Sequence, residues 1–267
     1  MKSTTIGRPA GIPAAVSYGS IINSGDSFGL IEGLVGGTGS CWWTQLINGM
    51  HAAWGLRCVE HVKIPPGASC GTHLHDKAEE IYYILDGTAV MTVNDHEFEV
   101  EAGELITCPL GTTHGIGVPA TAAEPMSFLV VEVFPGSAPP LAQPERYPVR
   151  AHLRATEGYR GYQADDLRIA HVDLTRCFTG PWLGFTEIVI PPHDALPPHD
   201  RLGPYTLPGR GAEVLFVADG EAELTAGNQV LKGGRGACLA AALDAPVTVR
   251  NLSNRQDLRV LSVQGQA

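Results

Sequence analysis

The sequence predicts an all-β protein built from two tandem copies of one unit of short antiparallel strands. Glycine and proline are both frequent, at 32 and 20 of 267 residues, and this punctuation is typical of short strands joined by turns. No stretch shows the periodicity of a long amphipathic helix. Two segments of similar pattern also follow one another along the chain, which indicates an internal duplication.

The duplication is clearest around two proline pairs. The segment V-K-I-P-P-G-A-S-C-G-T-H-L-H recurs as I-V-I-P-P-H-D-A-L-P-P-H-D-R, which places Pro191 126 residues after Pro65. The segment E-I-Y-Y-I-L-D-G recurs as E-V-L-F-V-A-D-G, and here Glu213 follows Glu80 by 133 residues. The extra residues of the second copy fall in the loop-like stretch L-G-P-Y-T-L-P-G-R-G-A.

These patterns divide the chain into four parts. Residues 1–50 are expected to form an N-terminal arm of short strands and turns that packs on the domains. Residues 51–136 form the first domain, residues 137–150 a proline-rich linker, and residues 151–267 the second domain. Trp42 and Trp43 are expected to be packing residues at a domain or subunit contact.

The first copy holds side chains suited to binding a metal ion. His73 and His75 are two residues apart, so both imidazoles face the same side of an extended strand. Glu80 follows after a turn, and His114 arrives from a later segment. Three imidazoles and one carboxylate suit one divalent transition metal and leave positions for water, O2 or substrate. Fe(II) is the expected ion, with Mn, Ni, Co and Zn as alternatives.

The same residues resemble the two motifs of the cupin family. The first motif, G-x5-H-x-H-x3,4-E-x6-G, is matched at Gly67, His73, His75, Glu80 and Gly87. The second, G-x5-P-x-G-x2-H-x3-N, is matched at Gly103, Pro109, Gly111 and His114, with Val118 in place of the final Asn.

This resemblance implies a bicupin, two tandem jelly-roll barrels with the metal inside the first. In that family the three histidines and the glutamate of the motifs are the metal ligands. The motif allows either Glu79 or Glu80, and the six residues before Gly87 favour Glu80, which leaves Glu79 pointing outward.

The second copy has an incomplete ligand set. His73 and Glu80 correspond to His199 and Glu213, but the other two histidines correspond to Arg201 and Val247. A degenerate site in a structural partner domain is therefore expected. Two alternatives stay open: His193 completes a metal site, or Arg201 and His199 hold a carboxylate or phosphate.

Two further residues are candidates for catalysis. Alternation along L-R-C-V-E-H-V-K-I places Glu60 on the interior face with Leu56, Cys58, Val62 and Ile64. A buried carboxylate is costly unless it is compensated, so Glu60 is either a general base near the metal or a strand-end residue that reaches solvent. Tyr82 shares the inward face of Glu80, where it either donates a hydrogen bond to substrate or fills the barrel.

Composition excludes several classes of partner. A net charge of −10 and the absence of a basic stripe argue against nucleic acid, and no apolar run is long enough to span a membrane. Residues 1–13 lack the apolar core of a secretory signal, and the six cysteines form no C-x-x-C pair. We therefore expect a cytoplasmic protein with reduced, buried thiols. Trp42 and Trp43 point to a homodimer.

The resemblance implies a metal-dependent enzyme that acts on a small organic substrate. An Fe(II)-type dioxygenase is favoured, because four ligands leave two positions of an octahedral ion where O2 and substrate can meet. The alternatives are an isomerase, lyase or decarboxylase that uses the ion as a Lewis acid, and a non-catalytic bicupin that binds a small ligand. Metal affinity is expected to fall below about pH 6, because imidazoles must be neutral to bind.

Overall fold

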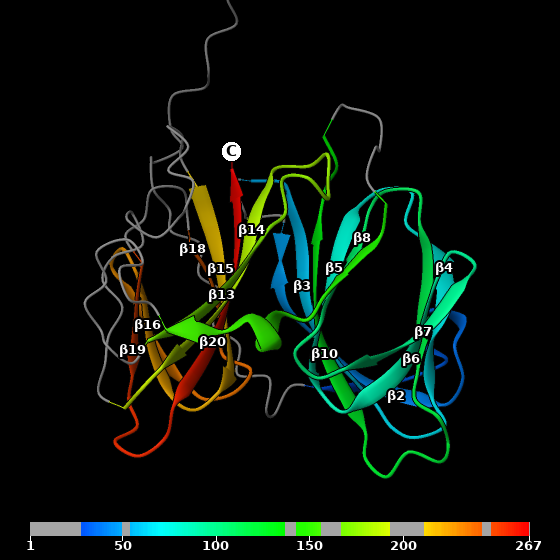
Figure 1. Ribbon diagram of the computed structural model, residues 1–267, viewed down its shortest axis with the longest axis horizontal. Helices are drawn as coiled ribbons and strands as arrows, with labels where there is room; N and C mark the ends of the chain where they lie inside the picture. Colours follow the sequence, from blue (N-terminus) through cyan, green and yellow to red (C-terminus); the bar gives the residue numbers. More distant parts are fainter. Residues whose placement is uncertain are drawn as a thin grey trace, which may run out of the picture.

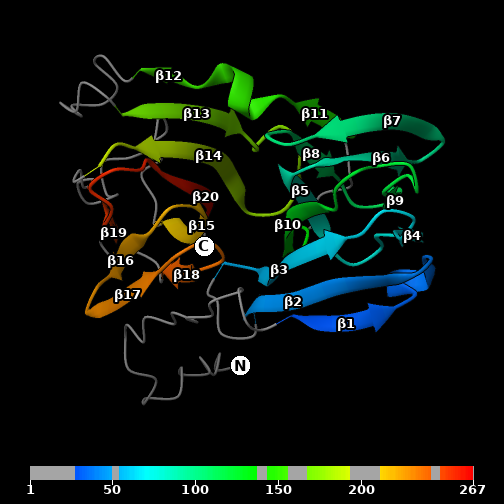
Figure 2. The same ribbon diagram turned by 90° about the horizontal axis from the view of Figure 1, so that it is seen from below.

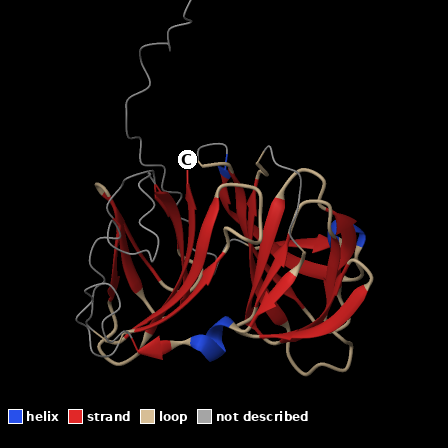
Figure 3. Ribbon diagram, turned by 45° about the horizontal axis from the view of Figure 1, so that its top comes forward, coloured by secondary structure: helices blue, strands red, loops and turns tan. Residues whose placement is uncertain are grey.

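The computed structural model describes residues 28–49, 54–136, 143–155, 167–192, 211–241 and 247–266. The all-β prediction is confirmed, since these ranges consist of strands β1 to β20 with two short 3-10 helices (Figure 3). Within them, no helix has the length and apolar character needed to cross a membrane.

The first barrel joins two antiparallel sheets. The seven-stranded sheet has the order β1-β2-β3-β10-β5-β8-β11, and the four-stranded sheet has the order β4-β9-β6-β7. Their bounds are β1 Gly29–Glu32, β2 Ser40–Asn48, β3 Leu56–Ile64, β4 Ser69–Leu74, β5 Glu79–Asp86, β6 Thr88–Val93, β7 His96–Glu101, β8 Leu105–Cys108, β9 Thr113–Gly117, β10 Met126–Val133 and β11 Glu145–Tyr147, with 3-10 helix η2 at Leu34–Gly36.

The second barrel repeats this plan with a six-stranded sheet, β12-β13-β14-β20-β15-β18, and a three-stranded sheet, β17-β16-β19. The bounds are β12 Arg154–Ala155, β13 Arg168–Asp173, β14 Trp182–Ile190, β15 Gly211–Asp219, β16 Ala222–Ala226, β17 Gln229–Gly233, β18 Cys238–Ala241, β19 Val247–Asn251 and β20 Leu258–Gln266. The 3-10 helix η4, Val149–His152, precedes β12. The predicted tandem of jelly-roll barrels is thereby confirmed.

The two large sheets face each other in the middle of the molecule, and the small sheets lie at its outer ends (Figures 1 and 2). One continuous apolar cluster fills the space between the large sheets. It draws on both barrels, with Tyr83 and Val131 from the first and Phe185 and Phe216 from the second. The rings of Tyr83 and Phe185 stack with centroids 5.0 Å apart. Burial of this cluster links the stability of one barrel to that of the other.

Two segments predicted to lie outside the domains contribute strands to the first barrel. β1 and β2, within the predicted arm, extend its large sheet at one edge, and β11, within the predicted linker, pairs with β8 at the other. Trp42 on β2 is partly exposed, whereas the Trp43 side chain packs against the core of the first barrel.

Strand β5 illustrates how alternation divides the molecule. Ile81 and Tyr83 point into the cluster between the barrels. Tyr82 and Ile84 point into the interior of the first barrel. The period of two therefore gives β5 two buried faces, one for each environment.

The alternation predicted for β3 fails at its first residue. Glu132 of β10 pairs with Cys58 and Val133 pairs with Leu56, so Arg57 has no register partner on β10 and forms a β-bulge. Leu56 consequently packs between the barrels, not inside the first barrel as expected. Bulges redirect side chains in this way and are common beside active sites.

Glycines of the cupin motifs make turns that other residues would strain. Gly87 joins β5 to β6 at φ 74°, and a Cβ there would lie 2.8 Å from the carbonyl oxygen of Pro125. Gly103 has φ 95°, and its Cβ would meet Arg150 at 2.5 Å. A side chain at either position would be disfavoured both by backbone conformation and by contact.

All six cysteines are free and buried, as predicted. Their burial among strands makes them small apolar side chains of the core.

The shared apolar cluster predicts a single cooperative unfolding transition. Phe185→Ala should lower the free energy of unfolding by about 3–5 kcal/mol, because it removes a fully buried ring from this cluster. Circular dichroism and tryptophan fluorescence should then still report the same midpoint. Val230→Ala, at an exposed position, is the control and should change stability by less than about 0.5 kcal/mol. Two separate transitions would contradict a shared core.

Candidate metal centre

Four predicted ligands converge inside the first barrel. The candidate ligand atoms of His73, His75, Glu80 and His114 all lie within 4.8 Å of one another. His73 Nε2 is 3.0 Å from His75 Nε2. Glu80 Oε2 is 3.2 Å from His75 Nε2 and 2.8 Å from His114 Nε2. Of the two glutamates that the motif allows, Glu80 is the one that reaches this cluster.

The local backbone explains how distant residues meet. His73 on β4 lies directly opposite His114 on β9 in the antiparallel register. A bulge between Cys70 and His73 bends β4 just before the ligands. His75 follows the strand, and its backbone N–H donates to the carbonyl of Thr112 at 3.0 Å. The two motif segments are therefore joined by hydrogen bonds at the site itself.

Hydrogen bonds also set the orientation of two imidazoles. His73 Nδ1 lies 2.9 Å from the carbonyl oxygen of Gly71, and His75 Nδ1 lies 3.3 Å from that of Ala78. A carbonyl only accepts, so Nδ1 carries the proton on each ring and Nε2 presents its lone pair to the centre. This is the usual way in which proteins prepare histidine for a metal ion.

Burial controls the charge of the cluster. It lowers the pKa of His75 and brings the pKa of His114 down to about 4, which favours the neutral imidazoles that metals bind. It raises the pKa of Glu80 to about 7, against the opposing effect of the neighbouring His75 and His73. Protonation of the Glu80 carboxyl is therefore expected to oppose metal binding near neutral pH, in addition to the imidazole protonation expected from the sequence.

The buried polar atoms test whether a cation fits. Glu80 Oε2 and His114 Nε2 are both inaccessible to solvent, and although they lie 2.8 Å apart, neither forms a hydrogen bond among the described residues. Leaving such atoms unsatisfied is costly. A divalent ion ligated by both atoms would remove that cost, so the donor set fits a transition metal.

Glu60 lies on the interior face of β3, as predicted. Its Oε2 accepts a hydrogen bond of 2.8 Å from Trp43 Nε1. The negative charge of Glu60 raises the pKa of Glu80, so the two carboxyl groups interact electrostatically. Glu60 is therefore an electrostatic neighbour of the candidate ligand Glu80.

Tyr82 forms one wall of the site. Its ring packs edge-on against His114 with centroids 5.1 Å apart, and against Phe128 at 5.0 Å. Burial raises the pKa of the phenol well above its ordinary value, so the side chain stays neutral.

A cavity of about 260 Å³ opens beside Glu60 at the mouth of the first barrel. We call it the mouth cavity; its lining residues are Gln45, Asn48, Gly49, Arg57, Cys58, Glu60 and Phe134. Glu132 pairs in register with Cys58 on one side and Glu80 on the other, so it lies between the cavity and the candidate centre. Arg57, turned by the bulge, forms an ion pair with Glu132.

Sequence reasoning did not identify Glu132 or the ion pair that Arg57 forms with it. A charged residue within the otherwise apolar strand M-S-F-L-V-V-E-V was a signal that pointed to Glu132. No local pattern signalled the bulge that redirects Arg57.

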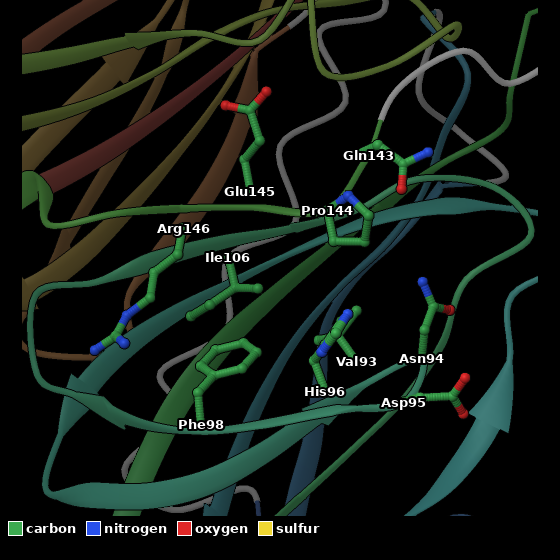
Figure 4. Close-up of a pocket in the computed structure, with 10 residues that line it drawn as sticks. All are labelled: Val93, Asn94, Asp95, His96, Phe98, Ile106, Gln143, Pro144, Glu145 and Arg146. Atoms are coloured by element: carbon green, nitrogen blue, oxygen red, sulfur yellow. The ribbon is translucent and has the colours of Figure 1, made fainter.

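A second cavity, of about 320 Å³, lies between the β6–β7 hairpin and β11 (Figure 4). Phe98, Ile106 and Val93 form its apolar part. Ile106 pairs in register with Tyr82, and Val93 pairs with His114. The apolar part of this cavity is therefore the part nearest the centre, through Ile106 and Val93.

The second barrel lacks a comparable cluster within its described residues. Glu213 accepts a hydrogen bond from Ser262, and Val247, the counterpart of His114, is buried in an apolar core. His193, His199 and Arg201 lie outside the described residues.

Comparison with known proteins places this chain in a family. The profile of the cupin domain matches residues 60–132. An oxalate-binding protein of Thermotoga maritima is 34% identical over 88 residues, which is 32% of this chain and 71% of that protein. The fold and the ligand cluster agree with these matches, and the chain belongs to the cupin family.

Solved structures share the two-barrel fold. AerE from Microcystis aeruginosa superposes with a TM-score of 0.64 at 17% identity, covering 90% of this chain and 97% of that one. Oxalate decarboxylase from Bacillus subtilis superposes with a TM-score of 0.64 at 14% identity, covering 96% of this chain and 77% of that one. The chain is therefore a bicupin in architecture.

Substituting matched glutamates locates the metal. Glu80→Gln, His75→Ala and His114→Ala should each reduce bound metal from about one ion per chain to a small fraction, because each removes a converging donor. Glu213→Gln, the counterpart of Glu80→Gln in the second barrel, should retain it. Elemental analysis of the purified variants measures this. Loss of metal from Glu213→Gln alone would show that the metal binds in the second barrel and would contradict this prediction.

The raised pKa of Glu80 predicts proton release on metal binding. Below pH 7 the metal-free carboxyl holds a proton that a cation must displace, so affinity should fall about tenfold per pH unit from pH 7 to pH 5.5. Calorimetric titration at pH 6 in buffers of different ionisation enthalpy should show release of about one proton. An affinity that stays constant over this range would contradict the assignment.

Proposed function

We propose that this protein is a metal-dependent enzyme that oxidises a small carboxylic acid with O2 in its first barrel. The observation that carries the proposal is the convergence of three imidazoles and one carboxylate, with two of the imidazole tautomers fixed by backbone carbonyls. A redox-active divalent ion held by His73, His75, Glu80 and His114 would bind a chelating carboxylate and O2.

Two observations support a carboxylic acid as substrate. The relative from Thermotoga maritima is described as oxalate-binding and is 34% identical to this chain over 88 residues. The mouth cavity is also lined by Arg57, whose guanidinium is paired with Glu132 through one nitrogen, and by the amide side chains of Gln45 and Asn48. A guanidinium and amide N–H groups are the donors that orient a carboxylate.

The interior of the barrel supports oxidation. Val62, Ile84 and Phe128 are buried and belong to the same apolar cluster as Tyr82. An apolar interior excludes bulk water, which protects reactive species from side reactions. The neutral phenol of Tyr82 adds no charge to this wall.

Glu60 favours a second candidate, a decarboxylase or isomerase. Its carboxylate borders the mouth cavity and is held by Trp43, so it is placed to move a proton to or from a bound substrate. In that reaction the ion would polarise the substrate, and no O2 would be consumed.

Glu60→Gln distinguishes the two reactions. In an oxidation that does not use Glu60 for proton transfer, kcat should fall by less than about tenfold. A lyase or isomerase with Glu60 as base should lose about 10²- to 10⁴-fold. The measurement is O2 uptake and product formation with oxalate and small hydroxy and oxo acids, with Glu213→Gln as the matched control. Turnover under strict anaerobiosis would rule out oxidation by O2 and favour a decarboxylase or isomerase. Binding without turnover would indicate a ligand-binding protein.

A further inference from the structure

Glu79, the neighbour of the candidate ligand Glu80, is bound entirely by the second barrel. Its Oε1 accepts hydrogen bonds from the backbone N–H of Thr179 at 2.8 Å and from the Thr179 hydroxyl at 2.7 Å. Its Oε2 accepts from the backbone N–H of Gly180 at 2.8 Å and from Trp182 Nε1 at 3.0 Å. The side chain is fully buried, and four donors compensate its charge.

The segment that receives Glu79 is shaped for it. Trp182 is buried and stacks on Phe178 with ring centroids 4.6 Å apart, which fixes the position of its N–H. At Gly180, a Cβ would lie 2.7 Å from Glu79 Oε2, so only glycine lets the backbone approach the carboxylate this closely. These features make residues 178–182 a rigid receptor for one carboxylate.

Glu80 depends on the same strand for its position. Its Oε2 lies 2.8 Å from His114 Nε2 and 3.2 Å from His75 Nε2, but it forms no hydrogen bond among the described residues, so no hydrogen bond orients that oxygen. The backbone at the start of β5 directs the Glu80 carboxylate toward the imidazoles. Glu79, the preceding residue, anchors the same backbone from the opposite face of the strand. Ligand positions must be held within about 0.5 Å for tight binding, which makes such support consequential.

We infer that Glu79 is a positioning residue, through which the second barrel holds Glu80 in place for the metal ion of the first barrel. The inference rests on the proposed metal centre. It assigns the second barrel a role at that centre, although that barrel's described residues hold no comparable cluster.

Tyr83 supplies a matched control on the same face of β5. Its hydroxyl donates to Glu187 of the second barrel at 2.6 Å, and both side chains are buried. Tyr83→Phe therefore breaks a buried hydrogen bond between the barrels, as Glu79→Gln does. This bond lies three residues from Glu80 along the chain, whereas Glu79 is directly adjacent to Glu80. Any effect that comes only from a weaker interface should be shared by Tyr83→Phe and Glu79→Gln.

The test measures Co²⁺ affinity and the Co²⁺ d–d spectrum of the full chain, together with the unfolding midpoint. Glu79→Gln should weaken Co²⁺ binding by about 10- to 100-fold and alter the spectrum, because an amide N–H would face the donors of Gly180 or Thr179. Tyr83→Phe should lower the midpoint but keep the affinity within about twofold. Thr179→Val, which removes one donor from the second barrel, should weaken binding less than Glu79→Gln, whereas Thr179→Ser should restore it.

The outcomes separate this inference from the proposed function. If His114→Ala abolishes Co²⁺ binding but Glu79→Gln and Thr179→Val bind it like the natural chain, the positioning role is wrong and the centre stands. Equal weakening by Tyr83→Phe and Glu79→Gln would also overturn the role, since it would reflect the interface alone. Retention of Co²⁺ by His114→Ala would instead remove the centre itself. Should Glu79→Gln not fold, Thr179→Val against Thr179→Ser decides the question.

Discussion

The structure depends on the alternation of strand β5 between two buried environments. Glu80 and Tyr82 point into the first barrel, where Glu80 meets the three imidazoles and Tyr82 walls the site. Glu79 and Tyr83 point the other way and bind the second barrel. A shift of one residue in the register of β5 would exchange these two sets, so the candidate centre and the contact between the barrels require the same pairing.

Buried carboxylates show how the molecule distributes charge. Glu79 is compensated by four N–H or O–H donors, and Glu187 by Tyr83 and the Arg259 guanidinium at 3.0 Å. Glu132 is paired with Arg57. Glu80 differs, because it faces imidazoles that burial keeps largely neutral. A buried carboxylate without a fixed cation is what a metal site requires before the ion arrives.

The duplicated halves have diverged toward different tasks. The first barrel places polar side chains at the mouth of its interior, whereas the interior of the second is a continuous apolar cluster that includes Leu215, Val217 and Val249. An apolar core stabilises a barrel without the desolvation cost of buried charge. The second barrel can therefore act as a rigid support, and the segment 178–182 shows one place where that rigidity reaches the candidate centre.

Local spacing in the sequence determined the strands, the duplication and the convergence of His73, His75, Glu80 and His114, because motif glycines and a period of two act over a few residues. It also placed Glu60 and Tyr82 on the interior face. Tertiary structure alone decided the rest. The donors of Glu79 lie about one hundred residues away, the bulge at Arg57 arises from pairing with β10, and the pKa of Glu80 follows from burial by distant strands. None of these leaves a local pattern, since each depends on which segments the folded chain brings together.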